Sequence, residues 1–187
     1  MQIINWDDFF TNKTFFEPTA ITVGVFDGVH RGHSELLRKT AASGLFPVVI
    51  TFRKSPRQFF QGSDYPGDII PLKERLALFE AAGIKAAVLI DFSLNFSKMS
   101  ARDFIKTLQN NGLMRYLVIG QDFHCGFRNE ASAADVKLMN DEAETGIITE
   151  IVPPVMEDGL PVSSSRIRAA IAKKNKEAAA SLLGRVI

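Results

Sequence analysis

Short apolar runs recur along the chain at intervals that fit alternating strands and helices. These runs are rich in β-branched and aromatic residues, and they are nearly continuous in apolar character. A strand with one face in water alternates apolar and polar residues, so continuous runs indicate strands covered on both faces, as in a parallel sheet. The predicted strands are residues 20–26, 46–52, 86–92, 116–123 and 146–152.

Helical patterns lie between and after these runs. Behind the first and second strands, apolar residues recur at helical spacing and the patterns stop at Gly44 and Gly83. The next helix opens with Ser100 and Asp103 in an arrangement similar to a capping box, and it stops at Gly112. The predicted helices are residues 34–44, 71–83, 100–112, 134–144, 165–175 and 176–184.

The alternation of strand and helix predicts an α/β fold with a doubly wound parallel sheet and right-handed crossovers. A chain of 187 residues can bury one sizeable core but is too short for two full domains, so residues 1–187 are expected to form one domain. The Pro/Gly-rich segment 61–71 (QGSDYPGDIIP) is predicted to be an excursion between the second strand and its helix, and it is a candidate flap.

Composition and charge narrow the classes of partner. Hydrophobic residues make up 46% of the chain and charged residues 23%, which is typical of a globular protein. The net charge of +1 gives no overall field toward nucleic acid or an anionic membrane. Cys125 is a lone cysteine, and there is no signal-peptide pattern and no apolar run near the ~18 residues of a membrane-spanning helix. We expect a cytoplasmic protein with no nucleic-acid or membrane partner, and the oligomeric state stays open.

Residues 24–33 read GVFDGVHRGH and contain two of the three histidines, His30 and His33. They follow the first predicted strand, where open α/β sheets usually bind ligands. The glycines permit a sharp turn, and the helix expected to begin near His33 offers unpaired N–H groups and a positive dipole end to a phosphate. Since neither G-x-G-x-x-G nor a Walker A loop is present, both histidines, with Gly32 between them, are candidates to contact one polyphosphate.

Two other interpretations of the histidine pair are weaker. An H-x-x-H pair could bind zinc, but His124 and Cys125 are the only other soft ligands and they form no second ligand pair. The two histidines could also be ordinary polar residues of a surface loop. Their position among glycines after an apolar strand favours the phosphate interpretation.

A second candidate anion site lies at residues 161–170 (PVSSSRIRAA). Three hydroxyls precede a predicted helix, and Arg166 and Arg168 fall in its first turn, where the positive dipole end disfavours basic side chains. A bound anion would offset that repulsion; the alternative is an ordinary serine cap with solvated arginines. Two such segments, one after the first strand and one after the last, fit a nucleoside triphosphate lying across the strand ends.

These residues also carry a resemblance to a known family. His30-Arg31-Gly32-His33 resembles the HxGH signature of the nucleotidylyltransferase superfamily, and SSSRIR resembles its SSTxxR element. The whole chain resembles the FMN adenylyltransferase module of bacterial bifunctional riboflavin kinase/FMN adenylyltransferases, also called FAD synthetases. Five segments carry it in order: GVFDGVHRGH, TF...P.R..F at 51–60, IGQDF at 119–123, VSSSRIR at 162–168 and the terminal LLGR.

The resemblance implies a Rossmann-like three-layer nucleotidylyltransferase fold and an enzyme that transfers AMP from ATP to FMN, giving FAD and pyrophosphate. A phosphomonoester with a second pKa of ~6 is mostly dianionic at pH 7, so the nucleophile needs no general base. The enzyme would then have to position the substrates and to neutralise the charge on the leaving pyrophosphate. Mg²⁺ would bridge phosphate oxygens, without a metal site on the protein. The implied catalytic residues are His30 and His33 on the triphosphate, with Ser164, Ser165 and Arg168 on its β- and γ-phosphates.

The resemblance implies further nucleotide and acceptor contacts. Asp122 could accept hydrogen bonds from ribose hydroxyls, and Asp27 would shape the turn around the nucleotide or cap its own turn. Loop phenylalanines, Phe60 and Phe127 among them, could stack on a flat isoalloxazine ring. The implied nucleotide-binding residues are Gly24, Phe26, Asp27, Gly32, Gly120, Asp122 and Arg166, and the acceptor-side residues are Phe52, Arg57, Phe59 and Phe123.

The chain departs from the family pattern on the acceptor side. Lys54 and Ser55 stand where a TFxPHP-like stretch has proline and histidine, and DFHCG at 122–126 replaces DFxFG. On the ATP side only Ser165 differs, replacing a threonine but keeping the hydroxyl. His124 lies in the altered loop and could touch substrate or be solvated.

Three hypotheses follow from this pattern. The first is an Mg²⁺-dependent FMN adenylyltransferase, and the second is an adenylyltransferase for another phosphorylated acceptor, such as a pantetheine or nicotinamide derivative. The third is a non-catalytic nucleotide- or flavin-binding paralogue. Because the sequence stops at LLGRVI, where bifunctional relatives continue, a riboflavin kinase domain is expected to be absent and FMN to come from another enzyme.

Overall fold

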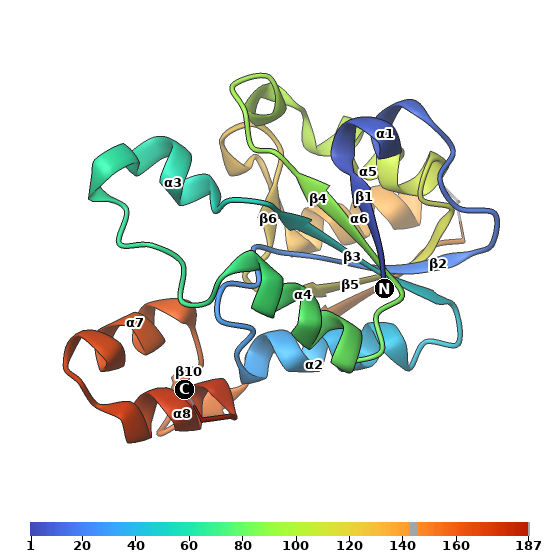
Figure 1. The fold of residues 1–187 in the computed structure, drawn as a ribbon. Helices are drawn as coiled ribbons and strands as arrows, with labels where there is room; N and C mark the ends of the chain where they lie inside the picture. Colours follow the sequence, from blue (N-terminus) through green and yellow to red (C-terminus); the bar gives the residue numbers. More distant parts are fainter. Residues whose placement is uncertain (143–145, 187) are drawn as a thin grey trace.

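A parallel sheet forms the centre of the structure, a computed structural model that describes residues 1–142 and 146–186. Within these residues the sheet has six strands in the order β1-β4-β3-β2-β5-β8, and each neighbouring pair is parallel (Figure 1). The predicted α/β fold with a doubly wound parallel sheet is confirmed. The strands are β1 (Gln2–Asn5), β2 (Thr19–Val23), β3 (Phe46–Phe52), β4 (Ala86–Ile90), β5 (Met114–Gly120) and β8 (Ile148–Val152).

Helices cover both faces of this sheet, which gives three layers. Helices α1, α5 and α6 pack on one face, and α2 and α4 pack on the other (Figure 1). The predicted start of α5 at Ser100 and Asp103 is present: Ser100 is the N-cap, and its Oγ accepts from the N–H of Asp103 at 3.0 Å and donates to the Asp103 carboxylate at 2.7 Å. The helices are α1 (Trp6–Thr11), α2 (Arg31–Ala41), α4 (Leu72–Ala81), α5 (Ala101–Asn110) and α6 (Ala133–Glu142).

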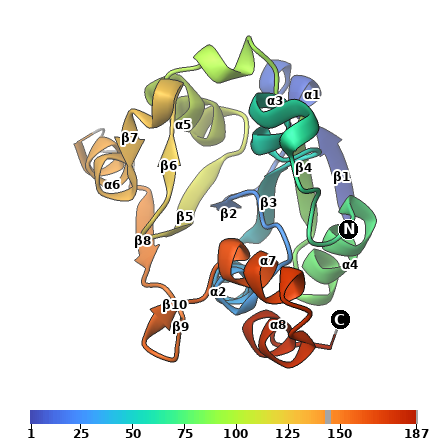
Figure 2. The ribbon, with the colours of Figure 1, turned by 90° about the vertical axis from the view of Figure 1, so that its left-hand side faces the viewer.

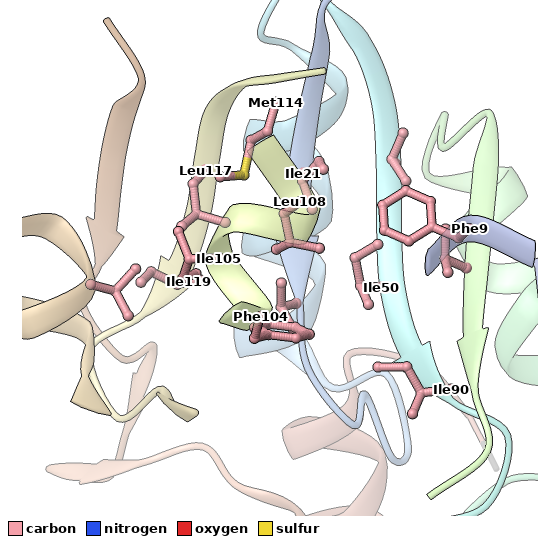
Figure 3. Close-up of a cluster of buried hydrophobic side chains, with 14 of the residues drawn as sticks. Phe9, Ile21, Ile50, Ile90, Phe104, Ile105, Leu108, Met114, Leu117 and Ile119 are labelled. Carbon is pink, nitrogen blue, oxygen red and sulfur yellow. The ribbon is translucent and has the colours of Figure 1, made fainter. Parts of the chain in front are cut away.

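Successive side chains of a strand point to opposite faces of the sheet, and each face has its own hydrophobic core. On β3, Val48 and Ile50 pack toward α1 and α5, whereas Val49 packs toward α2 and α4. Figure 3 shows the first of these cores, in which Phe104 and Leu108 of α5 lie against the sheet. The strands read as continuous apolar runs because both of their faces are buried.

Smaller elements gather beyond the carboxyl ends of the strands (Figure 2). Two short antiparallel hairpins pair β6 with β7 and β9 with β10. The last two helices, α7 and α8, pack against each other through Val162, Ile167, Leu182 and Leu183. These elements are α3 (Pro56–Gln61), η1 (Gly62–Asp64), η2 (Phe96–Lys98), β6 (His124–Cys125), η3 (Phe127–Asn129), β7 (Ala131–Ser132), β9 (Met156–Glu157), β10 (Leu160–Pro161), α7 (Ser164–Ala172) and α8 (Lys176–Leu183).

Several predicted boundaries need correction. Strand β2 ends at Val23 and helix α2 begins at Arg31, so the turn between them covers residues 24–30 and lies three residues earlier than the predicted turn at 27–33. Strand β1 was not predicted, and neither was α3. Residues 143 and 144 of the predicted helix 134–144 lie outside the described residues. In residues 1–142 and 146–186, no helix is long and apolar enough to cross a membrane.

Candidate active site

The turn between β2 and α2 has an unusual backbone. Phe26, Gly28 and Val29 all have left-handed φ angles, of +54°, +81° and +40°. This region is unfavourable for side chains, and most of all for a β-branched residue such as Val29. The ring of Phe26 is fully buried beneath the turn, 3.1 Å from where a Cβ on Gly24 would lie. Phe26 and Gly24 therefore pack together within the turn, and the Phe26 ring faces the core, while their predicted role around the nucleotide stays a prediction.

His30 and His33 lie at the first turn of α2. His30 is the N-cap residue, and its Nδ1 accepts a 3.3 Å hydrogen bond from the N–H of His33. The two imidazole rings stack with centroids 3.6 Å apart and planes at 16°. A Cβ on Gly32 would lie 3.2 Å from the His30 ring, so a larger residue there would press on it. The HxGH spacing thus allows two parallel imidazoles at a helix amino terminus.

Both histidines are held in the neutral form. Burial lowers the pKa of His30 to about 4, with a further contribution from the charge of Arg185, while Asp122 opposes the shift. Burial lowers the pKa of His33 well below its usual value, and the charge that His30 gains on protonation and the positive charge of Arg75 act in the same direction. Each ring at pH 7 therefore has one N–H donor and one acceptor nitrogen. Within the described residues, the buried Nδ1 of His33 has no hydrogen-bond partner.

The serine-arginine segment lies directly against this turn. Ser163 is the N-cap of α7 and accepts a 3.3 Å hydrogen bond from the N–H of Arg166, whereas Ser164 Oγ donates to the carbonyl of Asp27 at 2.9 Å. The guanidinium of Arg168 forms an ion pair with the Asp27 carboxylate. The two segments, far apart in sequence, are therefore in contact outside the carboxyl ends of the strands.

Asp27 connects three parts of the site. One carboxylate oxygen pairs with Arg168, and the other accepts a 2.8 Å hydrogen bond from the N–H of Ile69. Arg168 also donates to the carbonyl of Gly67 at 3.2 Å. Asp27 thus joins the turn to α7 and to the base of the segment predicted as a flap, instead of capping its own turn.

The other predicted nucleotide contacts occupy different surroundings. Arg166 donates through Nη1 to the carbonyls of Glu157, Leu160 and Pro161, at 2.9 to 3.1 Å, and so holds the β9–β10 hairpin. Gly120 is the last residue of β5. Asp122, two residues later, is exposed, and its negative charge acts to raise the pKa of His30. Ser165 is exposed at the start of α7. Nucleotide contacts by these residues stay predictions.

The predicted acceptor-side residues divide into two groups. Phe52 and Phe59 belong to an aromatic cluster near the carboxyl ends of β3 and β4, in which ring centroids are 5.4 to 6.0 Å apart. Phe59 is 47% exposed, and Arg57 is exposed on the same helix, α3. Phe123 packs against the same hydrophobic core as Phe52 but is not a member of this cluster. The cluster consists of Phe52, Phe59, Phe60, Phe92 and Phe96.

The departures from the family pattern have a local structural role. Ser55 is buried as the N-cap of α3, where its Oγ accepts a 3.3 Å hydrogen bond from the N–H of Arg57. Pro56 follows at the first position of the helix, which suits its fixed φ angle. In the second altered segment, His124 is exposed and its Nδ1 lies 2.9 Å from the carbonyl oxygen of Asp122.

Two residues that sequence analysis did not assign hold the turn in place. Arg75 on α4 is 1% exposed and donates to the carbonyls of Val25 and Phe52, at 2.7 and 2.5 Å. Arg185 donates to the carbonyls of Gly28 and Val29, at 2.6 and 2.9 Å. Arg75 gives no signal in the sequence, whereas Arg185 falls in the LLGR segment that carries part of the family resemblance.

This parallel sheet, with the histidine turn and the serine-arginine segment outside the carboxyl ends of its strands, has the fold of an α/β nucleotidylyltransferase-like protein. A pantothenate synthetase from Thermus thermophilus shares the fold, with a TM-score of 0.60 and 16% identity over 97% of this chain and 72% of that one. The chain belongs to the FAD synthetase family, whose sequence model matches residues 12–166. The resemblance found in the sequence is therefore confirmed.

Individual relatives are similar over most of the chain. The bifunctional riboflavin kinase/FMN adenylyltransferase of Haemophilus influenzae is 32% identical over 171 residues, covering 89% of this chain and 55% of its own length. That of Escherichia coli is 31% identical over 173 residues, with coverages of 90% and 55%. A crystal structure described as a macrolide-efflux protein from Streptococcus pneumoniae has a TM-score of 0.83 and 30% identity, over 99% of this chain and 62% of that one. The chain spans about half the length of the curated relatives it matches.

Proposed function

We propose that this chain is an FMN adenylyltransferase, which transfers AMP from ATP to FMN and releases pyrophosphate. The observation that carries the proposal is the contact of Ser164 and Arg168 with Asp27, beside the paired histidines. Membership of the FAD synthetase family and the names of the relatives support FMN as the acceptor. We also propose that residues 1–187 act as one domain, and an ATP-consuming reaction fits the predicted cytoplasmic location.

In this reaction an oxygen of the FMN phosphate attacks the α-phosphorus of ATP. The new phosphorus–oxygen bond forms as the bond from the α-phosphorus to the bridging oxygen of the leaving pyrophosphate breaks. Neutral His30 and His33 would donate N–H groups to the triphosphate, and the negative phosphates would raise the pKa of both rings. Arg168, with Ser164 and Ser165, would neutralise the charge that builds on the pyrophosphate.

Mg²⁺ fits this site as an ion carried mainly by the nucleotide. No group of three or more His, Cys, Asp or Glu side chains that could hold a metal occurs in residues 1–142 and 146–186. Mg²⁺ in phosphate-transfer sites is commonly held by substrate phosphates, water and only one or two carboxylates. When bound, it would offset the charge of the phosphate oxygens. The protein's own contribution is then the histidines, the hydroxyls and Arg168.

The aromatic cluster at the ends of β3 and β4 provides a surface for the flavin ring. Phe59 and Phe60 are 47% and 69% exposed, and their rings meet edge to face with centroids 5.4 Å apart. Flat aromatic ligands stack on such rings. Arg75 bridges the carbonyls of Phe52 and Val25, so the aromatic cluster and the histidine turn share one buried anchor. FMN bound here would lie beside the triphosphate.

The direct test is incubation with FMN, ATP and Mg²⁺, followed by chromatographic separation of FAD and measurement of pyrophosphate. We expect FAD and pyrophosphate in equal amounts. Riboflavin is the matched control because it has the same ring system but lacks the phosphate nucleophile, and it should give neither product. Absence of FAD across a titration of FMN would contradict the proposal.

A second candidate keeps the transfer chemistry but changes the acceptor. It is favoured by Ser55, a buried helix cap where relatives are expected to have histidine, and by the altered segment at 122–126. The assay is pyrophosphate release with 4′-phosphopantetheine or nicotinamide mononucleotide in place of FMN. Faster release with either compound than with FMN would favour this candidate, and release with FMN alone would exclude it for these acceptors.

A further inference from the structure

The backbone of the β2–α2 turn needs external support because three of its residues have left-handed φ angles. Val29, directly before His30, is the most strained, with a β-branched side chain at φ +40°. Such conformations persist when surrounding contacts over-determine them. The contacts that hold this turn therefore also set the position of His30.

The carbonyl groups of the turn show where this support comes from. Arg75 and Thr51 donate to the carbonyl of Val25, and Ser164 donates to that of Asp27. The next two carbonyls, of Gly28 and Val29, both accept from Arg185. Arg185 is thus the side chain that donates to both of the turn carbonyls nearest His30.

The end of α8 aims Arg185 at the turn. Gly184 ends the helix in the left-handed conformation at φ +73°, and its N–H donates to the carbonyl of Ala180 at 2.8 Å. Leu183 is buried beside Gly28, where a Cβ would lie 3.4 Å from its side chain. This turn directs the half-buried Arg185 back toward Gly28 and Val29. Arg185 lies beyond residues 12–166, which the family model matches.

We propose that Arg185 is a positioning residue, which holds the carbonyls of Gly28 and Val29 so that His30 is aligned with the triphosphate of ATP. The inference rests on the proposed function, because it assumes a triphosphate at His30. The two terminal nitrogens of Arg185 each donate to a different carbonyl. The planar guanidinium fork provides this arrangement, and the single ammonium group of lysine does not.

Arg185 also acts on His30 electrostatically. Its positive charge contributes to the lowered pKa of His30, in the same direction as burial, and Asp122 opposes both. The charged groups that influence the histidine pair are thus Asp122 and Arg185 at His30, and Arg75 at His33. Loss of the Arg185 charge should raise the pKa of His30, which a purely structural role for Arg185 would not do.

The test compares Arg185→Gln and Arg185→Lys with Lys176→Gln, which removes a charge from the exposed start of α8. We expect Arg185→Gln to weaken binding of a non-hydrolysable ATP analogue with Mg²⁺ and to lower kcat by ~10-fold or more, the scale of a displaced catalytic group. By proton NMR, the His30 resonance should titrate at a higher pH. In Arg185→Lys, His30 should titrate near the same pH as in the original chain, because the positive charge is kept. Its kcat should nevertheless fall nearly as far as that of Arg185→Gln. Lys176→Gln should change neither.

Two results would contradict the positioning role of Arg185. Unchanged analogue binding and His30 titration in Arg185→Gln would overturn it, as would full activity in Arg185→Lys. If Arg185→Gln fails to fold, judged by near-ultraviolet circular dichroism, Arg185→Lys carries the test. If the original chain makes no FAD, the proposed acceptor fails, while analogue binding and the NMR titration still decide the role of Arg185.

Discussion

Arg168 on α7 forms an ion pair with Asp27, which lies 141 positions earlier in the chain, in the turn after β2. The pair is largely buried, because the Arg168 and Asp27 side chains are 20% and 6% exposed. It joins the turn that carries the histidines to the helix that carries the serines. A triphosphate at this position would offer Arg168 a second anionic partner beside Asp27.

Arg168→Ala should lower kcat by ~10²-fold or more if the guanidinium stabilises the charge on the leaving pyrophosphate. Steady-state rates of pyrophosphate release at saturating FMN and ATP measure this effect. Lys173→Ala is the matched control, since Lys173 is an exposed basic residue at the far end of the same helix. Equal losses in the two variants would argue for a general effect of α7, and full turnover in Arg168→Ala would contradict the assigned role.

His33→Ala should also lower kcat by ~10²-fold, because it removes a preorganised donor beside the triphosphate. His33 is held neutral by burial, with the positive charge of Arg75 acting in the same direction, so its contribution is a hydrogen bond and not a fixed charge. His33→Gln keeps an N–H donor and should recover part of the rate. His124→Ala, at an exposed position of β6, should retain the full rate. A rate in His33→Gln no better than in His33→Ala would weaken the donor assignment.

The histidine pair should make the protein less stable in mild acid. The pKa of His30 is about 4 in the folded chain, below the ordinary 6.5, so between these values the unfolded chain binds the proton preferentially. The free energy of unfolding should be at its full value above pH ~6.5 and should fall toward pH ~4, by up to ~1.4 kcal/mol per pH unit for His30. His33 shifts in the same direction.

Urea unfolding at several pH values between 5 and 7 measures this dependence. This window lies above the carboxylates whose pKa values are lowered, Glu35 and Glu150 among them, so it isolates the histidines. His30→Asn should flatten the profile, and His124→Asn should leave it unchanged. A profile that is flat from pH 7 to pH 5 in the original chain would show that the folded histidines bind protons as readily as the unfolded ones, which would contradict their lowered pKa values.

Much of the fold follows from local pattern. The predicted strands in the middle of the sheet, β2, β3 and β4, are buried on both faces, so their sequences are continuous apolar runs. Strand β8 lies at an edge and is only partly covered, but it too was predicted from its apolar residues. The helices between the strands end near glycines. Strand β1 was missed because its four residues, QIIN, have polar ends and form an edge of the sheet. Helix α3 was missed because it buries no residue and its PRQFFQ sequence has no apolar face.

The candidate site was predictable only where several of its residues form a short pattern in the sequence. The histidines and the serine-arginine segment form short patterns with a phosphate-binding rationale, and the structure brings them together. The partners of Asp27 were not predictable, because Ile69 and Arg168 reach it from distant elements. Arg75 was not predictable either, since a charged residue on an amphipathic helix is usually exposed.

Phe59→Ala should raise the KM for FMN several-fold while leaving the KM for ATP unchanged, because loss of a stacking ring removes ~1 kcal/mol of aromatic contact. Phe59 is 47% exposed in the aromatic cluster and far less buried than Phe26 or Phe79. Phe10→Ala is the matched control, since Phe10 is also 47% exposed but lies on α1 outside the cluster. An equal effect on both KM values would argue against a flavin-specific contact.

Arg75→Met should destabilise the protein and slow the reaction together. Arg75 is 1% exposed, and its loss leaves the carbonyl of Phe52 without this donor and the carbonyl of Val25 with Thr51 alone. Unpaired buried carbonyls cost about 1–3 kcal/mol each, but removing a buried charge offsets part of this, so we expect a net loss of about 2 kcal/mol in the free energy of unfolding.

Urea unfolding measures the stability change, and FAD formation below the unfolding transition measures the activity. Lys73→Met, an exposed position on the same helix, is the control and should change both little. Because Val25 begins the turn that carries His30, Arg75→Met should reduce kcat even under conditions where the chain is fully folded. If the variant is less stable but has full activity when folded, Arg75 holds the ends of β2 and β3 without influencing the histidines. If neither quantity changes, the two carbonyl contacts do not stabilise the turn.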